Sequence, residues 1–229
     1  MKIIKSFGYF ITTLWMYLVI PLLGWGIMDL GGFFRSSQRL AYALIVVALG
    51  VGVAWQSLST PQGFRGGEGR GETLVPRQRL IRIAVTLFLF FALLFLPFAD
   101  RAAIGTFPDD PAVRWIGVIL SGFGMGLVFW SGVALGKLYS GDVTLQEEHR
   151  LITDGPYRLV RHPRYLGGIL MGFGLALIFI SWIGLIGSVL FIAIILFRIR
   201  DEEILMQDAF GEEWERYCEH TRRLIPFVY

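Results

Sequence analysis

The chain has 229 residues, of which 55% are hydrophobic and 17% are charged, and its mean hydropathy is +0.60. A soluble domain usually carries about 25% charged residues, so the composition excludes an ordinary soluble domain and favours an integral membrane protein. The net charge of +3 is small and gives no reason to expect a nucleic-acid partner. Cys218 is the single cysteine; an internal disulfide and a cysteine zinc site are therefore excluded, and we expect no metal.

Four apolar segments come first, and each is long enough for a membrane crossing, which requires about 20 residues. They span residues 7–30, 40–58, 80–98 and 113–138. The first follows Lys2 and Lys5, like a signal peptide, but it is longer than the roughly 7–15 apolar residues of such a segment. We therefore interpret residues 1–138 as an N-terminal region of four transmembrane helices.

The next apolar run, residues 165–197, is too long for one crossing. As a single helix it would measure about 50 Å, whereas the hydrocarbon core is about 30 Å thick. The middle of the run reads Ser181-Trp182-Ile183-Gly184, a plausible tight turn. We predict a hairpin of two short helices, which makes the chain an all-α polytopic membrane protein with about six transmembrane helices. Within the hairpin, Gly168 and Gly172 have a spacing compatible with close helix contact.

The distribution of basic residues predicts the topology. With six crossings and a cytoplasmic N-terminus, 17 of the 21 Lys and Arg residues fall on the cytoplasmic side. The other side keeps only Arg35, Arg39, Arg101 and Arg114. Positive charge accumulates in cytoplasmic loops, so we expect a multi-pass protein with both termini in the cytoplasm.

A polar block lies before the hairpin, between His149 and Tyr165. It contains two histidines, two tyrosines and four arginines. Gly155-Pro156 is a turn signal, and Pro163 suits the first turn of a helix. His162 would then lie near the helix cap, where free N–H groups favour anions.

A second polar block, residues 198–217, follows the hairpin. Arg198 and Glu202 are four residues apart and share a helix face. They could form an ordinary ion pair worth about 0.2–0.5 kcal/mol, but charges at the edge of the apolar layer also line functional cavities. Phe210, Trp214 and Tyr217 follow at spacings of four and three. This stripe predicts an amphipathic tail helix that lies in the membrane interface or packs on the protein.

The hairpin returns Arg198 and Glu202 to the membrane side of His162 and Tyr165. A cation, a carboxylate, an imidazole and a phenol would then converge on one pocket at the cytoplasmic boundary. Such a pocket suits a charged cofactor that acts on a lipid-like substrate.

The two blocks together form one pattern. In chain order it reads Gly155-Pro156-Tyr157, Arg161-His162-Pro163-x-Tyr165-x-Gly167, the hairpin, Glu202-Glu203, Phe210-Gly211 and Tyr217. This pattern resembles the isoprenylcysteine carboxyl methyltransferase family over about residues 149–226. The resemblance implies a methyltransferase-like region at residues 139–229 and S-adenosylmethionine as the cofactor. It also implies methyl transfer to the carboxylate of a lipophilic or prenylated substrate among membrane lipids, and it leaves the oligomeric state open.

The resemblance also implies roles for individual residues. Cofactor contacts are implied for His149, Leu151, Ile152, Tyr157, His162, Pro163, Tyr165 and Glu202. Arg198 is implied to hold the substrate carboxylate, and Arg198 and Glu202 to be catalytic. The chemistry agrees: a sulfonium favours a carboxylate and aromatic faces, and a guanidinium can grip and align a carboxylate.

Three alternatives stay open. Phospholipid N-methyltransferases share much of the pattern, but their amine acceptor must lose a proton, so a base such as Glu203 would be required. Sterol-reductase-like enzymes resemble Arg-His-x-Asn-Tyr-x-Gly-Asp, whereas this chain has Pro163 and Arg164 before Tyr165. A non-enzymatic membrane scaffold would bind no small molecule.

Overall fold

The computed structural model describes residues 2–59, 76–136 and 151–225, and within these ranges it contains helices and no strand. The longer helices in chain order are α1 (Lys2–Leu14), α2 (Ile20–Trp25), α3 (Leu30–Arg35), α4 (Ser37–Ser59), α5 (Pro76–Ala102), α6 (Pro111–Leu135), α7 (Pro163–Ile178), α8 (Trp182–Phe210) and α9 (Glu212–His220). Short turns of helix are η1 (Trp15–Val19), η2 (Ile27–Asp29) and η4 (Gly155–Arg158). The predicted all-α class is confirmed.

Five helical stretches are long and apolar enough to cross a membrane. They are Lys2–Trp25, Ser37–Ser59, Leu80–Ala102, Pro111–Leu135 and Trp182–Phe210. The remaining apolar helix, α7, has 16 residues and is about 24 Å long, which is less than the hydrocarbon core of about 30 Å. The chain is therefore an integral membrane protein in which α7 forms a short sixth apolar helix.

The first span differs in its bounds from the predicted residues 7–30. The helix begins at Lys2 and continues through the π-helical turn η1 to Trp25, where Gly26 ends it with φ 109°. That conformation is open to glycine and costly for other residues. Asp29 then starts α3, because its carboxylate accepts a hydrogen bond from Gly32 N at 3.0 Å. The apolar residues after Gly26 belong to η2 and α3 rather than to the crossing.

The predicted hairpin is confirmed. Helix α7 ends at Ile178, and α8 begins at Trp182. The hydroxyl of Ser181 caps α8 by accepting a hydrogen bond from Gly184 N at 3.1 Å. Only α7 is short, however: α8 has 29 residues and carries the second polar block beyond the apolar layer.

Glycines join α6 to α7 without intervening side chains. A methyl group at Gly124 would lie 2.5 Å from the Gly167 carbonyl oxygen, and one at Gly167 would lie 2.7 Å from the Gly124 carbonyl oxygen. The backbones therefore touch, as small residues allow in membrane helices. Of the two glycines suggested by spacing, Gly168 makes no such contact, because a methyl group there would meet only Phe191, at 3.8 Å.

A buried ionic cluster fastens the end of the bundle that holds the hairpin turn. Asp100 on α5 pairs with Arg39 on α4 at 3.1 Å and with Arg114 on α6 at 2.8 Å. Arg114 also donates to the carbonyl oxygen of Ile178, next to the hairpin turn. Such pairs add little net stability, but each partner becomes costly to remove once buried.

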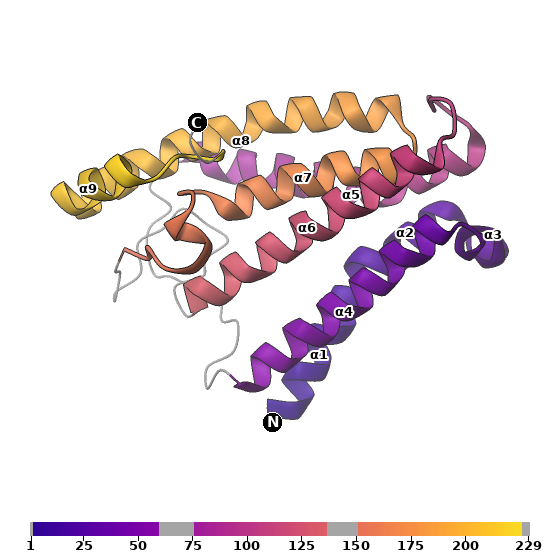
Figure 1. Ribbon diagram of the computed structural model, residues 1–229, viewed down its shortest axis with the longest axis horizontal. Coiled ribbons are helices and arrows are strands. Elements are labelled where there is room, and N and C mark those ends of the chain that lie inside the picture. The colour runs from indigo at the N-terminus through magenta and orange to yellow at the C-terminus, as the bar shows by residue number, and fades with distance from the viewer. Residues whose placement is uncertain (1, 60–75, 137–150, 226–229) are drawn as a thin grey trace.

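Figure 1 shows the consequence for the site. Helix α1 begins at one end of the bundle, and η4 and α9 lie at that same end. Helix α3 and the α7–α8 turn lie at the opposite end. The hairpin thus brings the polar part of α8 back beside the segment that precedes α7.

Candidate active site

Four of the predicted residues meet where α7 begins and α8 leaves the apolar layer. The Tyr165 hydroxyl donates to Glu202 Oε2 at 2.6 Å and accepts from Arg198 Nε at 2.7 Å. His162, the residue before α7, stacks on Tyr165 with ring centroids 5.6 Å apart. Its Nδ1 lies 4.0 Å from Glu202 Oε2. The predicted convergence of cation, carboxylate, imidazole and phenol is therefore present.

Glu202 and Arg198 differ in exposure. The Glu202 side chain is 25% exposed, whereas Arg198 is buried. Both project from α8 toward Tyr165, as their spacing of four residues requires. The Tyr165 hydroxyl bonds to both side chains and so links the guanidinium to the carboxylate.

The neighbouring carboxylate, Glu203, belongs to a separate group. It accepts hydrogen bonds from Arg161 Nε at 3.1 Å and from Arg223 Nε at 2.7 Å. His162 Nε2 lies 3.4 Å from Glu203 Oε1, yet it forms no hydrogen bond within the described ranges. Glu203 thus links α8 both to the segment before α7 and to the C-terminal segment.

The C-terminal segment after α9 supports the histidine, which the sequence reasoning did not anticipate. Arg161 N donates to Arg222 O at 2.7 Å, and His162 N donates to Arg223 O at 3.0 Å. These bonds accompany a parallel β-bridge between Val160 and Arg222. The backbone ahead of α7 is therefore fixed by a chain segment some 60 residues further along.

The aromatic stripe of the tail helix faces the protein. Trp214 is buried, and the Tyr217 hydroxyl donates to the carbonyl oxygen of Tyr157 at 2.7 Å. Burial raises the pKa of both Tyr157 and Tyr217, so both phenols keep their protons at neutral pH. Helix α9 is the predicted tail helix, and its Tyr217 binds it to η4.

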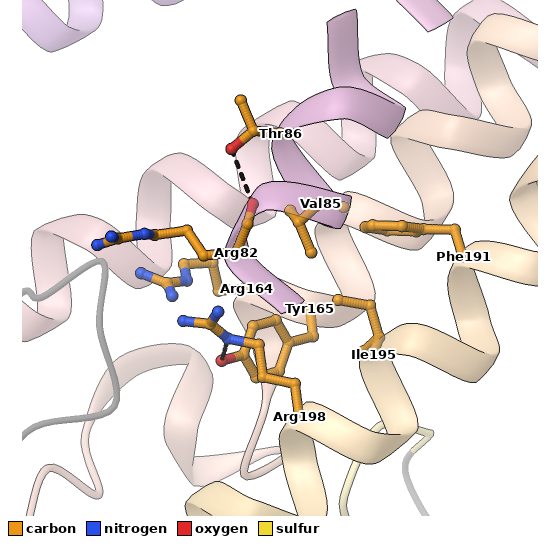
Figure 2. A pocket seen from close by; sticks show the side chains of 9 residues that line it. Arg82, Val85, Thr86, Arg164, Tyr165, Phe191, Ile195 and Arg198 are labelled. Carbon is orange, nitrogen blue, oxygen red and sulfur yellow. Dashed lines mark hydrogen bonds between the residues drawn. The ribbon is translucent and has the colours of Figure 1, made fainter. Parts of the chain in front are cut away.

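A cavity of about 210 Å³ lies beside Tyr165 and Arg198, between α5, α7 and α8. It is lined by Arg82, Val85, Thr86, Arg164, Tyr165, Gly168, Phe191, Ile195 and Arg198. Figure 2 shows the arginines reaching toward one side of it, with Val85, Phe191 and Ile195 on the other. The cavity thus has a cationic end, which includes Arg198, and an apolar end.

The remaining predicted residues lie around this group or outside the described ranges. Tyr157 lies in η4, near enough to Glu202 for that charge to raise its pKa further. Pro163 is buried in the first turn of α7. Leu151 and Ile152 are half-buried ahead of η4. His149 falls in the stretch 137–150, which the structure does not describe.

Several lining residues were not among the predicted ones. On α8 a signal existed: Phe191, Ile195 and Arg198 follow at spacings of four and three, which places them on one helix face. Arg82 carried no such signal, because it lies on α5, far from either polar block. The bundle alone brings it to Tyr165.

Comparisons with known proteins find methyltransferases. The family described as "Phospholipid methyltransferase" matches residues 112–213. Two relatives from Oryza sativa, subspecies indica and japonica, are each named "Probable protein-S-isoprenylcysteine O-methyltransferase" and are 26% identical over 119 residues. Each match covers 51% of this chain and 62% of the relative, so the similarity spans less than two thirds of the rice proteins.

The fold is also similar to a solved structure of a eukaryotic intramembrane Ras methyltransferase, isoprenylcysteine carboxyl methyltransferase. The match covers 97% of this chain and 93% of the chain in that structure. Its TM-score is 0.46 with 18% identity. The family and the rice relatives confirm the resemblance that the C-terminal motifs predicted.

Proposed function

We propose that the chain is a methyltransferase of the isoprenylcysteine carboxyl type, and that it transfers a methyl group from S-adenosylmethionine to the carboxylate of a lipophilic substrate. The observation that carries the proposal is the Arg198–Tyr165–Glu202 chain of hydrogen bonds at the cationic end of a partly apolar cavity. The guanidinium of Arg198 can bind the carboxylate of a substrate, and the carboxylate of Glu202 can bind the cationic part of the cofactor. Both groups lie near the apolar side chains of the cavity.

The residues present fit the proposed cofactor. Glu202 is partly exposed, and Tyr157, His162 and Tyr165 supply aromatic faces around it. A carboxylate and aromatic rings suit a cationic sulfonium and an amino group. When bound, S-adenosylmethionine would supply an electrophilic methyl group; Glu202 would hold and orient its positive end. We extend this proposal to His149, Leu151, Ile152 and Pro163 as further contacts.

Arg198 has the second role. A substrate carboxylate is already ionised near pH 7 and needs no general base, only alignment. The hydrogen bond from Arg198 Nε to Tyr165 fixes the guanidinium plane, so that the group is oriented before a substrate arrives. An oriented guanidinium can grip a carboxylate through two N–H groups, which an ammonium cannot do.

The proposal includes an orientation in the membrane. We place both termini and the active site on the cytoplasmic side, because 17 of the 21 basic residues then lie there and positive charge accumulates in cytoplasmic loops. Residues 139–229 would carry the methyltransferase-like region, with residues 1–138 as the membrane region before it. The substrate would be lipophilic or prenylated and would approach through the surrounding lipid.

The family description favours one alternative, methylation of a phospholipid amine. An amine must lose a proton to become a nucleophile, which requires a base. Glu203, the candidate base, already accepts hydrogen bonds from Arg161 and Arg223. Two guanidinium partners stabilise a carboxylate in its charged form and weaken it as a base, so the geometry favours the carboxylate acceptor.

The test is a methyl-transfer assay with radiolabelled S-adenosylmethionine on the detergent-solubilised full chain. The acceptors are N-acetyl-S-farnesylcysteine and phosphatidylethanolamine. We expect base-labile methyl ester on the first and no label on the second. Arg198→Lys keeps the charge but loses the planar fork, so we expect at least tenfold lower turnover with little change in cofactor affinity.

The opposite results would overturn the proposal. Label on phosphatidylethanolamine alone would assign the amine acceptor. Wild-type turnover in both Arg198→Lys and Arg198→Ala would exclude Arg198 from holding the substrate. A parallel loss of cofactor affinity would instead place Arg198 in the cofactor site.

A further inference from the structure

We infer that the cavity between α5, α7 and α8 receives the acidic head of a lipid-like ligand, and that Arg82 on α5 is a specificity-determining residue for that head. The inference deepens the proposed function and rests on it for the identity of the ligand as the methyl acceptor. Arg82 lies outside residues 112–213, the part of the chain that the family match covers.

The charges lining the cavity have one sign. Arg82, Arg164 and Arg198 contribute three guanidinium groups, and none of the lining residues that the structure describes is acidic. The three come from three different helices, so only the assembled bundle places them together. A cavity lined by charges of one sign between low-dielectric walls focuses their field and concentrates ions of the other sign. An acidic head group is attracted there, and a free ammonium group is repelled.

The arginines differ in depth. Arg198 is buried and bound to Tyr165, Arg164 is half-buried over the same ring at 5.5 Å, and Arg82 is exposed. In Figure 2 the Arg82 side chain extends toward the same side as Arg164 and Arg198. A head group held by Arg198 would therefore lie on the side of the cavity toward which the Arg82 guanidinium extends.

Helix α5 also supplies the apolar wall. Val85 lines the cavity three residues after Arg82. One turn further, Phe88 stacks on Phe191 with ring centroids 4.4 Å apart. The same face of α5 thus carries the cation and then apolar side chains. This is the order in which an amphiphile would present its acidic head and its hydrocarbon chain.

The test measures binding separately from methyl transfer. The probes are N-acetyl-S-farnesylcysteine and its methyl ester, which share the hydrocarbon chain but differ in the acidic head, and farnesyl phosphate as a second acid. Their dissociation constants are measured by isothermal titration on the full chain in detergent. The variants are Arg82→Gln, Arg82→Lys and the control Arg200→Gln, which removes an exposed cation from α8 outside the cavity lining.

We expect Arg82→Gln to weaken binding of the carboxylic acid about tenfold and to leave binding of the ester unchanged. Arg82→Lys should recover part of the loss, and Arg200→Gln should bind both probes as the wild type does. If farnesyl phosphate shows the larger Arg82-dependent loss, the site prefers phosphate over carboxylate as its acid. In the transfer assay, Arg82→Gln should raise KM and retain kcat.

Two results would overturn the inference. Equal loss of acid and ester in Arg82→Gln would show a packing defect rather than recognition of charge. Unchanged affinity for both acids would exclude Arg82 from the site. These outcomes are separable from the proposed function: methyl transfer with a wild-type KM in Arg82→Gln refutes only the inference, whereas Arg82-dependent acid binding without any methyl transfer refutes only the proposed function.

Discussion

Tyr165 connects the first polar block to both Arg198 and Glu202 of the second. Its hydroxyl accepts from Arg198 and donates to Glu202, while its ring stacks on His162. One buried phenol thereby sets the positions of the residues proposed for the substrate and for the cofactor. Hydrogen bonds that include charged partners are stronger than neutral ones, so this arrangement is rigid before any ligand binds.

The first residue-scale prediction concerns the cofactor. We expect Glu202→Gln and His162→Ala each to weaken S-adenosylmethionine binding by about 10- to 100-fold, because hydrogen bonds to charged groups contribute about 1.5–3 kcal/mol. Isothermal titration on detergent-solubilised protein measures this. Glu213→Gln, an exposed acid on α9, is the matched control. Wild-type affinity in both site variants would remove these residues from the cofactor site.

The second residue-scale prediction concerns Cys218. Burial raises the pKa of its thiol, and only the thiolate is reactive. We expect maleimide to label it more slowly than a model peptide cysteine at pH 7.5, with a rate that still increases above pH 9. A mass-spectrometric time course at several pH values measures this. Labelling at the peptide rate would contradict the raised pKa.

At the scale of elements, α7 is placed by its contact with α6. Membrane helices associate without a hydrophobic driving force, through close packing of small residues. The paired glycines bring the two backbones together, so the position of His162 at the start of α7 depends on a contact that continues along the length of that helix.

The element-scale prediction compares two adjacent glycines on α7. Gly167→Ala places a methyl group 2.7 Å from the Gly124 carbonyl oxygen and 2.8 Å from a Val128 methyl, so it should push the helices apart. A methyl group at Gly168 has room. Because alanine loses less backbone freedom on folding than glycine, Gly168→Ala should stabilise the folded protein by about 0.5–1 kcal/mol. We expect Gly167→Ala to lower Tm in detergent and Gly168→Ala to leave it unchanged or raised. Equal shifts for both variants would contradict the close contact.

At the scale of the whole molecule, the path of the chain places α1's start and α9 at one end of the bundle. The proposed site lies at that end, and the Arg39–Asp100–Arg114 cluster fastens the other. The two ends thus differ in their polar groups. At one end buried ion pairs connect the helices, and at the other end charged side chains lie beside a cavity.

The whole-molecule prediction concerns topology. Reporter fusions at Phe98, near the end of α5, and at the C-terminal Tyr229 should report opposite sides of the membrane, with the C-terminus cytoplasmic. Alkaline phosphatase activity and green fluorescent protein fluorescence distinguish the two sides. The same side for both fusions would contradict the six-helix arrangement.

The sequence by itself determined the membrane class, the hairpin and the grouping of Arg198 with Glu202. Each of these depends on local properties: apolar length against bilayer thickness, and the 3.6-residue period that places i and i+4 on one face. The hairpin also predicted that Arg198 and Glu202 would return to His162 and Tyr165, and the structure brings the four together.

Only the tertiary structure decided which distant segments support that group. The pairing of Arg161 and His162 with the C-terminal segment, the glycine contact of α6 with α7 and the arrival of Arg82 at the cavity all join residues far apart in the chain. In lipid, apolar surfaces face hydrocarbon and apolar side chains alike, so hydrophobicity does not specify which helices pack together. Close contact between backbones and buried polar contacts determine which helices pack together, and these contacts exist only once the helices are assembled.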